Sequence, residues 1–220
     1  MFNRINALKT KGFNPDSILD IGAHHGNWSA ATSAIYPQSK YYLFEAINYS
    51  ELNRFRGFDN VKVYNILLNE KITEVDWYEM KNTGDSIFKE KTYHFENCPI
   101  IKRESIDLDT HIKNTQILQD AKSIFMKIDC QGAEIPILKG ATEILKKTDV
   151  ILLEIPLFGQ YNEGVPTFLE HIQFMDSIGF TAYDITDNHY VKDFNIQIDM
   201  LFINKNHALN KTVSTALFEK

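Results

Sequence analysis

Short apolar runs alternate with helix-patterned segments along most of the chain, and this alternation restricts the fold more than any other feature of the sequence. Apolar runs of this length are typical of buried strands, and helices between successive strands are typical of parallel βαβ units. The runs are Ser17–Ile21, Tyr41–Glu45, Val61–Leu68, Ile124–Ile128 and Val150–Ile155. We therefore predict an α/β fold with a doubly wound, mostly parallel sheet.

Apolar residues at helical spacing follow the first, fourth and fifth runs. The expected helices carry the stripes Trp28, Ala31 and Ile35; Ile135, Leu138, Ala141 and Leu145; and Phe168, Ile172, Met175 and Ile178. Beyond them, Phe180–Thr186 and Ile198–Asn204 have the pattern of strands, and a polar, turn-rich stretch joins them. We expect these two strands to form a hairpin that closes one edge of the sheet.

The segment 73–109 interrupts the alternation. The strand-like run Glu74–Met80 is followed by the turn-forming residues Lys81–Asp85, which predicts an inserted β-hairpin between the third and fourth strands. No Pro/Gly/Ser-rich linker divides the 220 residues, so we expect one domain over residues 1–220.

Charge and cysteine content restrict the partners and the compartment. The chain has 23 Lys+Arg against 29 Asp+Glu, and its net charge of −6 gives no general attraction to nucleic acids or anionic membranes. Its two cysteines have neither metal-ligand spacing nor the pattern of a disulfide framework. No apolar run has the length of a membrane span or the form of a signal peptide. We expect a cytoplasmic protein without a nucleic-acid partner.

The stretch from Ser17 to Trp28 leads from a buried strand through a glycine-containing turn into a helix. Such a turn presents backbone N–H groups and a helix N-terminus to a ligand, and Gly22 and Gly26 would let a nucleoside-bearing cofactor approach the main chain. Dinucleotide-binding turns need G-x-G-x-x-G, but His24 and Asn27 occupy the second and third glycine positions. The turn therefore favours a nucleoside cofactor over a dinucleotide.

Two carboxylates flank this turn. Glu45 ends the second strand, where a carboxylate can accept hydrogen bonds from both hydroxyls of an adenosine ribose; the alternative is a solvated charge at a strand end. Asp20 ends the first strand and either serves the ligand or only caps the N–H groups of its own turn.

The residues from Phe125 to Ala141 carry the most specific pattern in the chain, Lys127-Ile-Asp129-Cys-Gln-Gly132-Ala-Glu134 followed by Leu138-Lys-Gly140-Ala141. This pattern resembles the signature of the FkbM family of S-adenosylmethionine-dependent methyltransferases. Supporting motifs in the family's order are Leu19-Asp20-Ile-Gly22-Ala23, Phe44-Glu45-Ala46, Gly84-Asp85-Ser86 and Ile106-Asp107-Leu108-Asp109. The departures are His24-His25 and Cys130-Gln131, which bear on the acceptor more than on the cofactor.

The resemblance implies a Rossmann-like methyltransferase sheet, parallel except for a reversed last strand, with S-adenosylmethionine over the first two strand ends. The expected cofactor-binding residues are Asp20, Gly22, Ala23, His24, Gly26, Asn27 and Glu45.

Methyl transfer from a sulfonium is an in-line displacement, so the enzyme must position a nucleophilic oxygen and accept its proton. Asp129, after the fourth strand, is the first candidate for the base or the acceptor-orienting group. Lys127 shares its strand parity and either serves catalysis or forms a structural ion pair. Glu154 ends the fifth strand and either binds acceptor hydroxyls or is a strand-end charge.

Other titratable residues have structural explanations that compete with chemistry. Glu134 opens a helix, where a carboxylate caps free N–H groups, and His24 or His25 either acts as a base or shapes the cofactor turn. Asp107, Asp109 and His111 do not complete the oxygen cage of a hard cation, so we predict no metal. The aromatic residues of the inserted segment contact a ligand ring or cover the core; they are Trp77, Tyr78, Phe88, Tyr93 and Phe95.

These observations predict an S-adenosylmethionine-dependent O-methyltransferase, and the resemblance implies a hydroxyl acceptor on a sugar, a glycan or another small metabolite. Two alternatives stay open: a nicotinamide-dependent oxidoreductase, and a non-catalytic nucleoside-binding module that keeps the pocket without turnover.

Overall fold

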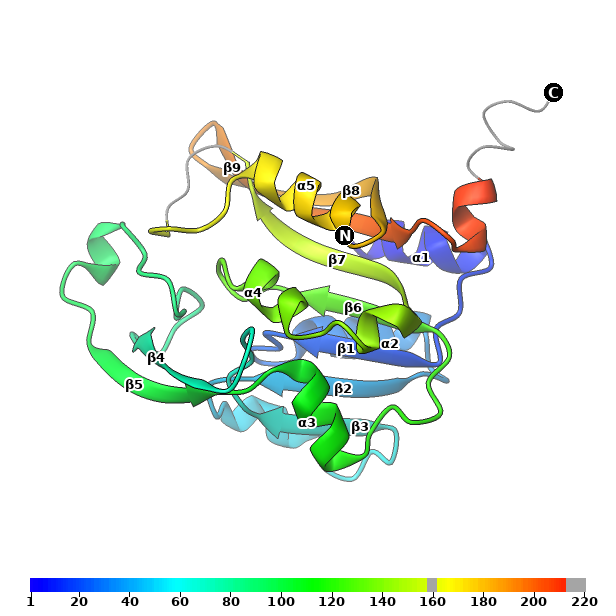
Figure 1. Cartoon of the computed structure of the whole chain (residues 1–220), viewed down its shortest axis with the longest axis horizontal. Coiled ribbons are helices and arrows are strands. Elements are labelled where there is room, and N and C mark those ends of the chain that lie inside the picture. The colour runs from blue at the N-terminus through cyan, green and yellow to red at the C-terminus, as the bar shows by residue number, and fades with distance from the viewer. Residues whose placement is uncertain (158–161, 213–220) are drawn as a thin grey trace.

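A computed structural model describes residues 1–157 and 162–212, and a seven-stranded sheet lies at its centre (Figure 1). The strand order is β3-β2-β1-β6-β7-β9-β8. The strands are β1 (Ser17–Ile21), β2 (Lys40–Glu45), β3 (Val61–Asn65), β6 (Ile124–Ile128), β7 (Thr148–Pro156), β8 (Phe180–Val191) and β9 (Phe194–Asn204). The first five pair in parallel, whereas β9 is antiparallel to both β7 and β8. The predicted α/β class, the mostly parallel sheet and the reversed last strand are confirmed.

Helices cover both faces of the sheet. On one face α1 (Phe2–Thr10) and α2 (Asn27–Ile35) bury Ile5, Leu8 and Trp28 in one hydrophobic cluster. On the other face, toward the viewer in Figure 1, lie α3 (Leu108–Thr115), α4 (Glu134–Lys139) and α5 (Phe168–Ser177). Every residue of β1 and β6 is buried, as expected for parallel strands covered on both faces. The polar exceptions in these two strands therefore need internal partners.

The inserted segment forms a separate two-stranded antiparallel sheet of β4 (Thr73–Tyr78) and β5 (Ile100–Ser105), as predicted. The turn at Lys81–Asp85 is present, but it is closed by the single bridge between Tyr78 and Ser86 and leads into a long connection rather than directly into the second strand. The Asp85 carboxylate accepts hydrogen bonds from the backbone N–H groups of Met80 and Lys81, both at 2.8 Å, which fixes this turn.

Two elements differ from the expectation. The single helix expected over 135–145 is the six-residue α4 followed by a 3₁₀ turn, Ile144–Lys147. The break occurs because the Asp109 carboxylate accepts from the N–H groups of Glu143 and Ile144 and starts a new turn there. The polar stretch expected as a connection between the last two strands is itself strand, because β8 and β9 extend to a tight turn at Lys192.

None of the helices in residues 1–157 and 162–212 is long and apolar enough to cross a membrane. One domain over residues 1–220 stays a prediction.

Candidate active site

A cleft of about 810 Å³ lies over the carboxyl ends of the parallel strands. At one end, the turn after β1 and the end of β2 form its wall; at the other end, side chains of β7, β8 and β9 do so. Ligands of open α/β sheets bind at this edge, where the strand order reverses on either side of β1. Most of the predicted cofactor-binding residues and the predicted catalytic residues thus face one continuous space.

The turn after β1 is anchored to the next strand. The backbone N–H groups of Gly22 and Ala23 donate to the carbonyl oxygen of Phe44, at 3.0 and 3.1 Å. Gly22 has φ +73°, and a Cβ at this position would lie 1.9 Å from the Asp129 carbonyl oxygen. The close approach of β1 and β6 therefore requires a glycine here. Gly22 also lines the cleft, so its predicted role beside a ligand stays a prediction.

Gly26 has a similar explanation. It caps α2 in the left-handed region, and a Cβ there would lie 2.4 Å from the ring of Phe55. Neither Gly26 nor Asp20 lines the cleft, whereas Gly22, Ala23, His24, Asn27 and Glu45 do.

Glu45 is fixed in the cleft wall by the backbone. Its Oε2 accepts from His24 N at 2.6 Å and its Oε1 accepts from Ile47 N at 2.9 Å. Burial raises the pKa of this carboxyl, and the two N–H groups partly offset that effect. Each oxygen retains a lone pair for a further donor, so the side chain can still accept hydrogen bonds from the hydroxyls of a bound ribose.

Aromatic rings stand beside Glu45. The rings of His24 and His25 stack with centroids 3.7 Å apart, and Tyr49 meets both edge-on. His24 adopts φ +48°, so it shapes the turn as one of the sequence alternatives expected. Burial lowers the pKa of its imidazole, which favours the neutral form. Asn27 accepts a hydrogen bond from Arg54 at 3.0 Å.

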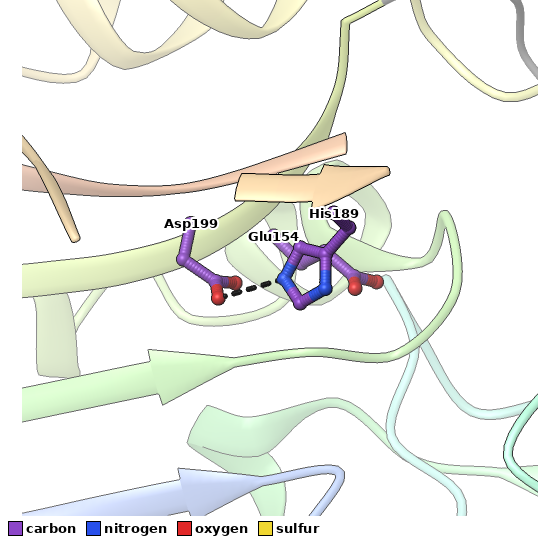
Figure 2. Close-up of side chains that lie close together, drawn as sticks. All are labelled: Glu154, His189 and Asp199. Atoms are coloured by element: carbon purple, nitrogen blue, oxygen red, sulfur yellow. Dashed lines mark hydrogen bonds and ion pairs between the residues drawn. The ribbon is translucent and has the colours of Figure 1, made fainter. Parts of the chain in front are cut away.

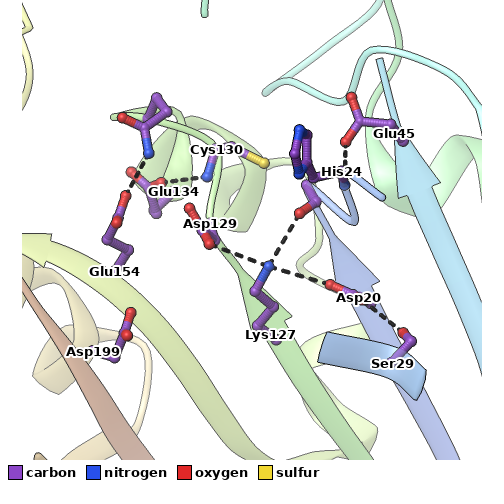
Figure 3. Close-up of polar contacts among 12 residues, drawn as sticks. Asp20, His24, Ser29, Glu45, Lys127, Asp129, Cys130, Glu134, Glu154 and Asp199 are labelled. Carbon is purple, nitrogen blue, oxygen red and sulfur yellow. Dashed lines mark hydrogen bonds and ion pairs between the residues drawn. The ribbon is translucent and has the colours of Figure 1, made fainter. Parts of the chain in front are cut away.

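Lys127 lies at the centre of a buried polar network (Figure 3). Its ammonium Nζ lies 3.3 Å from Asp20 Oδ1, 3.3 Å from Asp129 Oδ2 and 3.0 Å from the Gly22 carbonyl oxygen. Asp20 is fully buried and accepts a second hydrogen bond from Ser29 on α2, at 2.6 Å. Asp20 and Lys127 thus form the structural ion pair that the sequence left as an alternative, and they fix the turn after β1 to the end of β6.

This network sets the charge of Asp129. Burial alone would raise the pKa of its carboxyl, but the charge and hydrogen bond of Lys127 outweigh burial and hold the pKa below its ordinary value. Asp129 is therefore a carboxylate that orients partners and is a weak base.

Glu154 lies in the opposite state. Burial, followed by the charge of Asp129, raises the pKa of Glu154 well above its ordinary value. A hydrogen bond between the two carboxyl groups favours the same division, with the proton on Glu154. Gln131 Nε2 donates to Glu154 Oε2 at 2.8 Å, which places an amide, a carboxyl and a carboxylate on one wall of the cleft.

Glu134 caps the turn that follows β6, in agreement with the capping explanation. Its Oε1 accepts from Cys130 N at 2.8 Å, and burial raises the pKa of its carboxyl to about 7. The same turn is tied to the inserted segment, because Ser86 Oγ donates to the Gln131 carbonyl oxygen at 2.9 Å.

The remaining candidates have structural roles in the described residues. Asp107 caps α3 by accepting from Thr110 N at 2.8 Å. Asp109 caps the 3₁₀ turn that follows α4. The ring of His111 packs edge-on against Phe44 and Tyr64. Among the aromatic residues of the insertion, Trp77 and Phe95 are buried and line the cleft, whereas Tyr93 is 78% exposed.

Sequence reasoning missed three residues at the far end of the cleft. His189 and Gln197 line it, and Asp199 holds the His189 ring at 2.9 Å. His189 fell in the stretch interpreted as a connection. The sequence did contain a signal for Asp199, which is a lone charge within the apolar run Ile198–Ile203. A buried charge in a strand needs a partner.

Residues 20–182, more than half of the chain, match the sequence model described as Methyltransferase FkbM domain. The chain belongs to the FkbM family of methyltransferase domains. Membership confirms the resemblance inferred from the sequence, and the mostly parallel sheet agrees with the Rossmann-like fold that it implied. None of the curated proteins compared with this FkbM-family chain matches it significantly.

Solved structures share the fold of this FkbM-family chain. Methyltransferase FkbM from Methylobacillus flagellatus KT is 14% identical with a TM-score of 0.52, and the match covers 84% of this chain and 43% of that one. The 1,6-didemethyltoxoflavin-N1-methyltransferase of Burkholderia thailandensis, solved with 1,6-didemethyltoxoflavin and S-adenosylhomocysteine, is 11% identical with a TM-score of 0.52, covering 92% and 76%. Fibrillarin from Methanococcus jannaschii is 13% identical with a TM-score of 0.50, covering 88% and 68%. The chain spans less than half of the Methylobacillus protein.

Proposed function

We propose that this protein transfers a methyl group from S-adenosylmethionine to a hydroxyl oxygen of a sugar, a glycan or another small hydroxylated metabolite. The observation that carries the proposal is the continuity of the cleft between Glu45 at one end and the Asp129–Glu154 pair at the other. A donor seated at the first end and an acceptor at the second would meet over the end of β6.

The donor end suits a nucleoside. Glu45 offers free lone pairs at the cleft wall, and the rings of His24 and Tyr49 stand beside it. The N–H groups of Gly22 and Ala23 are already bonded to Phe44, so these two groups are not available to a pyrophosphate. That arrangement supports a sulfonium nucleoside as the ligand over NAD, the cofactor that the alternative function as an oxidoreductase would need.

The acceptor end suits hydroxyl groups. Asp129 accepts hydrogen bonds, the protonated Glu154 both donates and accepts, and Gln131 adds an amide. Several such groups fixed in one wall hold a polyhydroxylated ring in a defined orientation, and orientation is a large part of catalysis of a displacement. The bound S-adenosylmethionine supplies an electrophilic methyl carbon; the chain supplies the position and the proton acceptor.

We also propose that the protein acts in the cytoplasm and without a nucleic-acid partner. The net charge of −6 and the two free cysteines support this part of the proposal.

Calorimetry with S-adenosylhomocysteine and with NAD tests the donor end. We expect saturable binding of S-adenosylhomocysteine alone, and Glu45→Gln should weaken it about 10-fold or more, because an amide replaces one acceptor by a donor. Glu74→Gln, at an exposed position outside the cleft lining, is the matched control. Binding of NAD with no binding of S-adenosylhomocysteine would contradict the proposal.

Acceptor screening with methyl-labelled donor tests the second half of the proposal. Labelled product that resists mild base and proves to be a methyl ether would support O-methylation. Label found only on nitrogen or carbon would contradict it, and no turnover with any acceptor, despite donor binding, would favour the non-catalytic module.

A further inference from the structure

Three side chains that the sequence did not connect with one another lie close together at the acceptor end of the cleft (Figure 2). Glu154 on β7 and Asp199 on β9 are direct partners across the antiparallel pair, and His189 reaches them from β8. One nitrogen or oxygen of each lies within 4.8 Å of the other two. Two carboxylates directly opposite each other on paired strands repel, unless a positive group or a proton lies between them. His189 can provide either.

The ring of His189 is held in one orientation. Its Nε2 lies 2.9 Å from Oδ2 of Asp199, whose side chain is 6% exposed, whereas the imidazole is 42% exposed and lines the cleft. A carboxylate only accepts, so the hydrogen stays on Nε2 and the neutral ring carries its lone pair on Nδ1. In Figure 2 Nδ1 lies on the Glu154 side of the ring. The free lone pair therefore belongs to the acceptor end.

Asp129, the first candidate for the base, is less suited to accept a proton. It is paired with Lys127 at 3.3 Å, and the pKa of its carboxyl lies below the ordinary value. The hydrogen bond to Asp199 raises the pKa of His189 above 6.5, against the opposing effect of burial. A base is most effective when its pKa lies near the working pH. An imidazole is the side chain that ordinarily titrates in this range, whereas the pKa of the Asp129 carboxyl is lowered further from it.

We propose that His189 is the catalytic base of the methyl transfer and that Asp199 is its positioning residue. This inference rests on the proposed function. As Nδ1 accepts the hydroxyl proton, the acceptor oxygen forms its bond to the methyl carbon, and the electron pair of the carbon–sulfur bond stays on sulfur. The positive charge passes from the sulfonium to the imidazolium, which Asp199 stabilises, and the exposed ring edge returns the proton to solvent.

The charged neighbours of His189 fix the direction of its pH dependence. Asp199 on β9, Asp187 on its own strand and Asp129 on β6 all favour the protonated ring, and Glu154 on β7 stands beside it in its protonated form. The active form is the neutral ring, so kcat should rise with pH through the raised pKa of His189. Asp199→Asn removes the largest of these effects and should move that rise to lower pH while reducing the plateau.

The test compares His189→Gln, Asp199→Asn and the control Tyr190→Phe, an exposed residue on the same strand outside the cleft lining. His189→Gln should lower kcat by about 100- to 10,000-fold, the usual contribution of a general base. Its affinity for S-adenosylhomocysteine should stay within about threefold of the parent, since the loss concerns the transition state. If the parent itself does not bind S-adenosylhomocysteine, the proposed function fails rather than this inference.

An imidazole NMR titration of the protein without acceptor gives a readout independent of turnover. The His189 resonance should titrate above 6.5, and Asp199→Asn should bring it down. Activity of His189→Gln within about threefold of the parent would overturn the inference. So would loss of activity in a chelator with Mn²⁺ bound at the three side chains, because a metal-bound imidazole has no lone pair for the acceptor.

Discussion

At the scale of single residues, Lys127 explains why this site tolerates so many acids. Its ammonium satisfies Asp20, Asp129 and the Gly22 carbonyl together. Burial alone would lower its pKa, yet the two carboxylates outweigh burial and keep it protonated. Glu134 and Glu154 have no such cation beside them among the described residues, and burial raises the pKa of both carboxyls. The buried acids at this site are thus accommodated in two ways, by ion pairing with Lys127 or by binding a proton.

Glu134 makes stability depend on pH in an unusual direction. Its folded pKa is about 7, above the value of about 4.3 for an unfolded glutamate. Between these values the folded protein binds the proton and the unfolded chain does not, so the free energy of unfolding falls as pH rises through this window. Glu134→Gln removes this effect.

Relative to the parent, the free energy of unfolding of Glu134→Gln should rise by about 3 kcal/mol from pH 4 to pH 8. Urea denaturation at several pH values measures it. Glu143→Gln, an exposed residue nearby in sequence, serves as the control and should show a nearly constant difference. A constant difference for Glu134→Gln as well would contradict the assignment of a buried, protonated carboxyl.

At the scale of elements, the parallel strands could be predicted and the antiparallel ones only in part. β1, β2 and β6 are continuous apolar runs because both of their faces are covered. β8 contains three register irregularities, which interrupt the alternation that a sequence pattern relies on. The same difference explains the site: acids at the carboxyl ends of parallel strands were found, whereas His189 and Asp199 lie within an irregular hairpin and were not.

The junction of β1 and β6 depends on one glycine, which gives a prediction at this scale. In Gly22→Ala the new Cβ would lie 1.9 Å from the Asp129 carbonyl oxygen, so the two strand ends must separate. Gly12→Ala is a matched control, since Gly12 has φ +93° but nothing within 4 Å of its Cβ position.

Gly12→Ala should cost about 1 kcal/mol of unfolding free energy, the usual effect of a non-glycine residue at positive φ. Gly22→Ala should cost at least about 3 kcal/mol, because steric overlap adds to that strain. Guanidinium denaturation followed by circular dichroism compares them, and equal losses would show that the junction can relax.

At the scale of the whole molecule, acidic residues outnumber lysine and arginine in the cleft lining. Lys127 is the one lysine among the described residues that line it, arginine is absent from that lining, and the acids are Glu45, Asp85, Glu90, Asp129 and Glu154. With the lysine already paired, the histidines are the remaining cationic groups of this lining. His189 must be neutral to act as the proposed base, so a phosphate or carboxylate on the acceptor should be disfavoured.

Neutral glycosides should therefore be methylated with a kcat/KM at least about 10-fold above that of their phosphate esters, and added salt should narrow the gap. Competition between a labelled glycoside and its phosphate measures the ratio directly. Preference for the phosphorylated acceptor would mean that a cation outside this lining reaches the substrate.

The β8–β9 hairpin contributes His189 and Asp199 but joins the sheet through β7 alone. β1 and β2, which bear the proposed donor end of the cleft, lie on the far side of β6. Grafting another hairpin onto β7 would thus replace His189 and Asp199 and leave Asp129 and Glu154 in place. Among such proteins, we expect sequence differences that change the acceptor to concentrate in the β8–β9 hairpin. The proposed nucleoside-binding end at β1 and β2 should vary less.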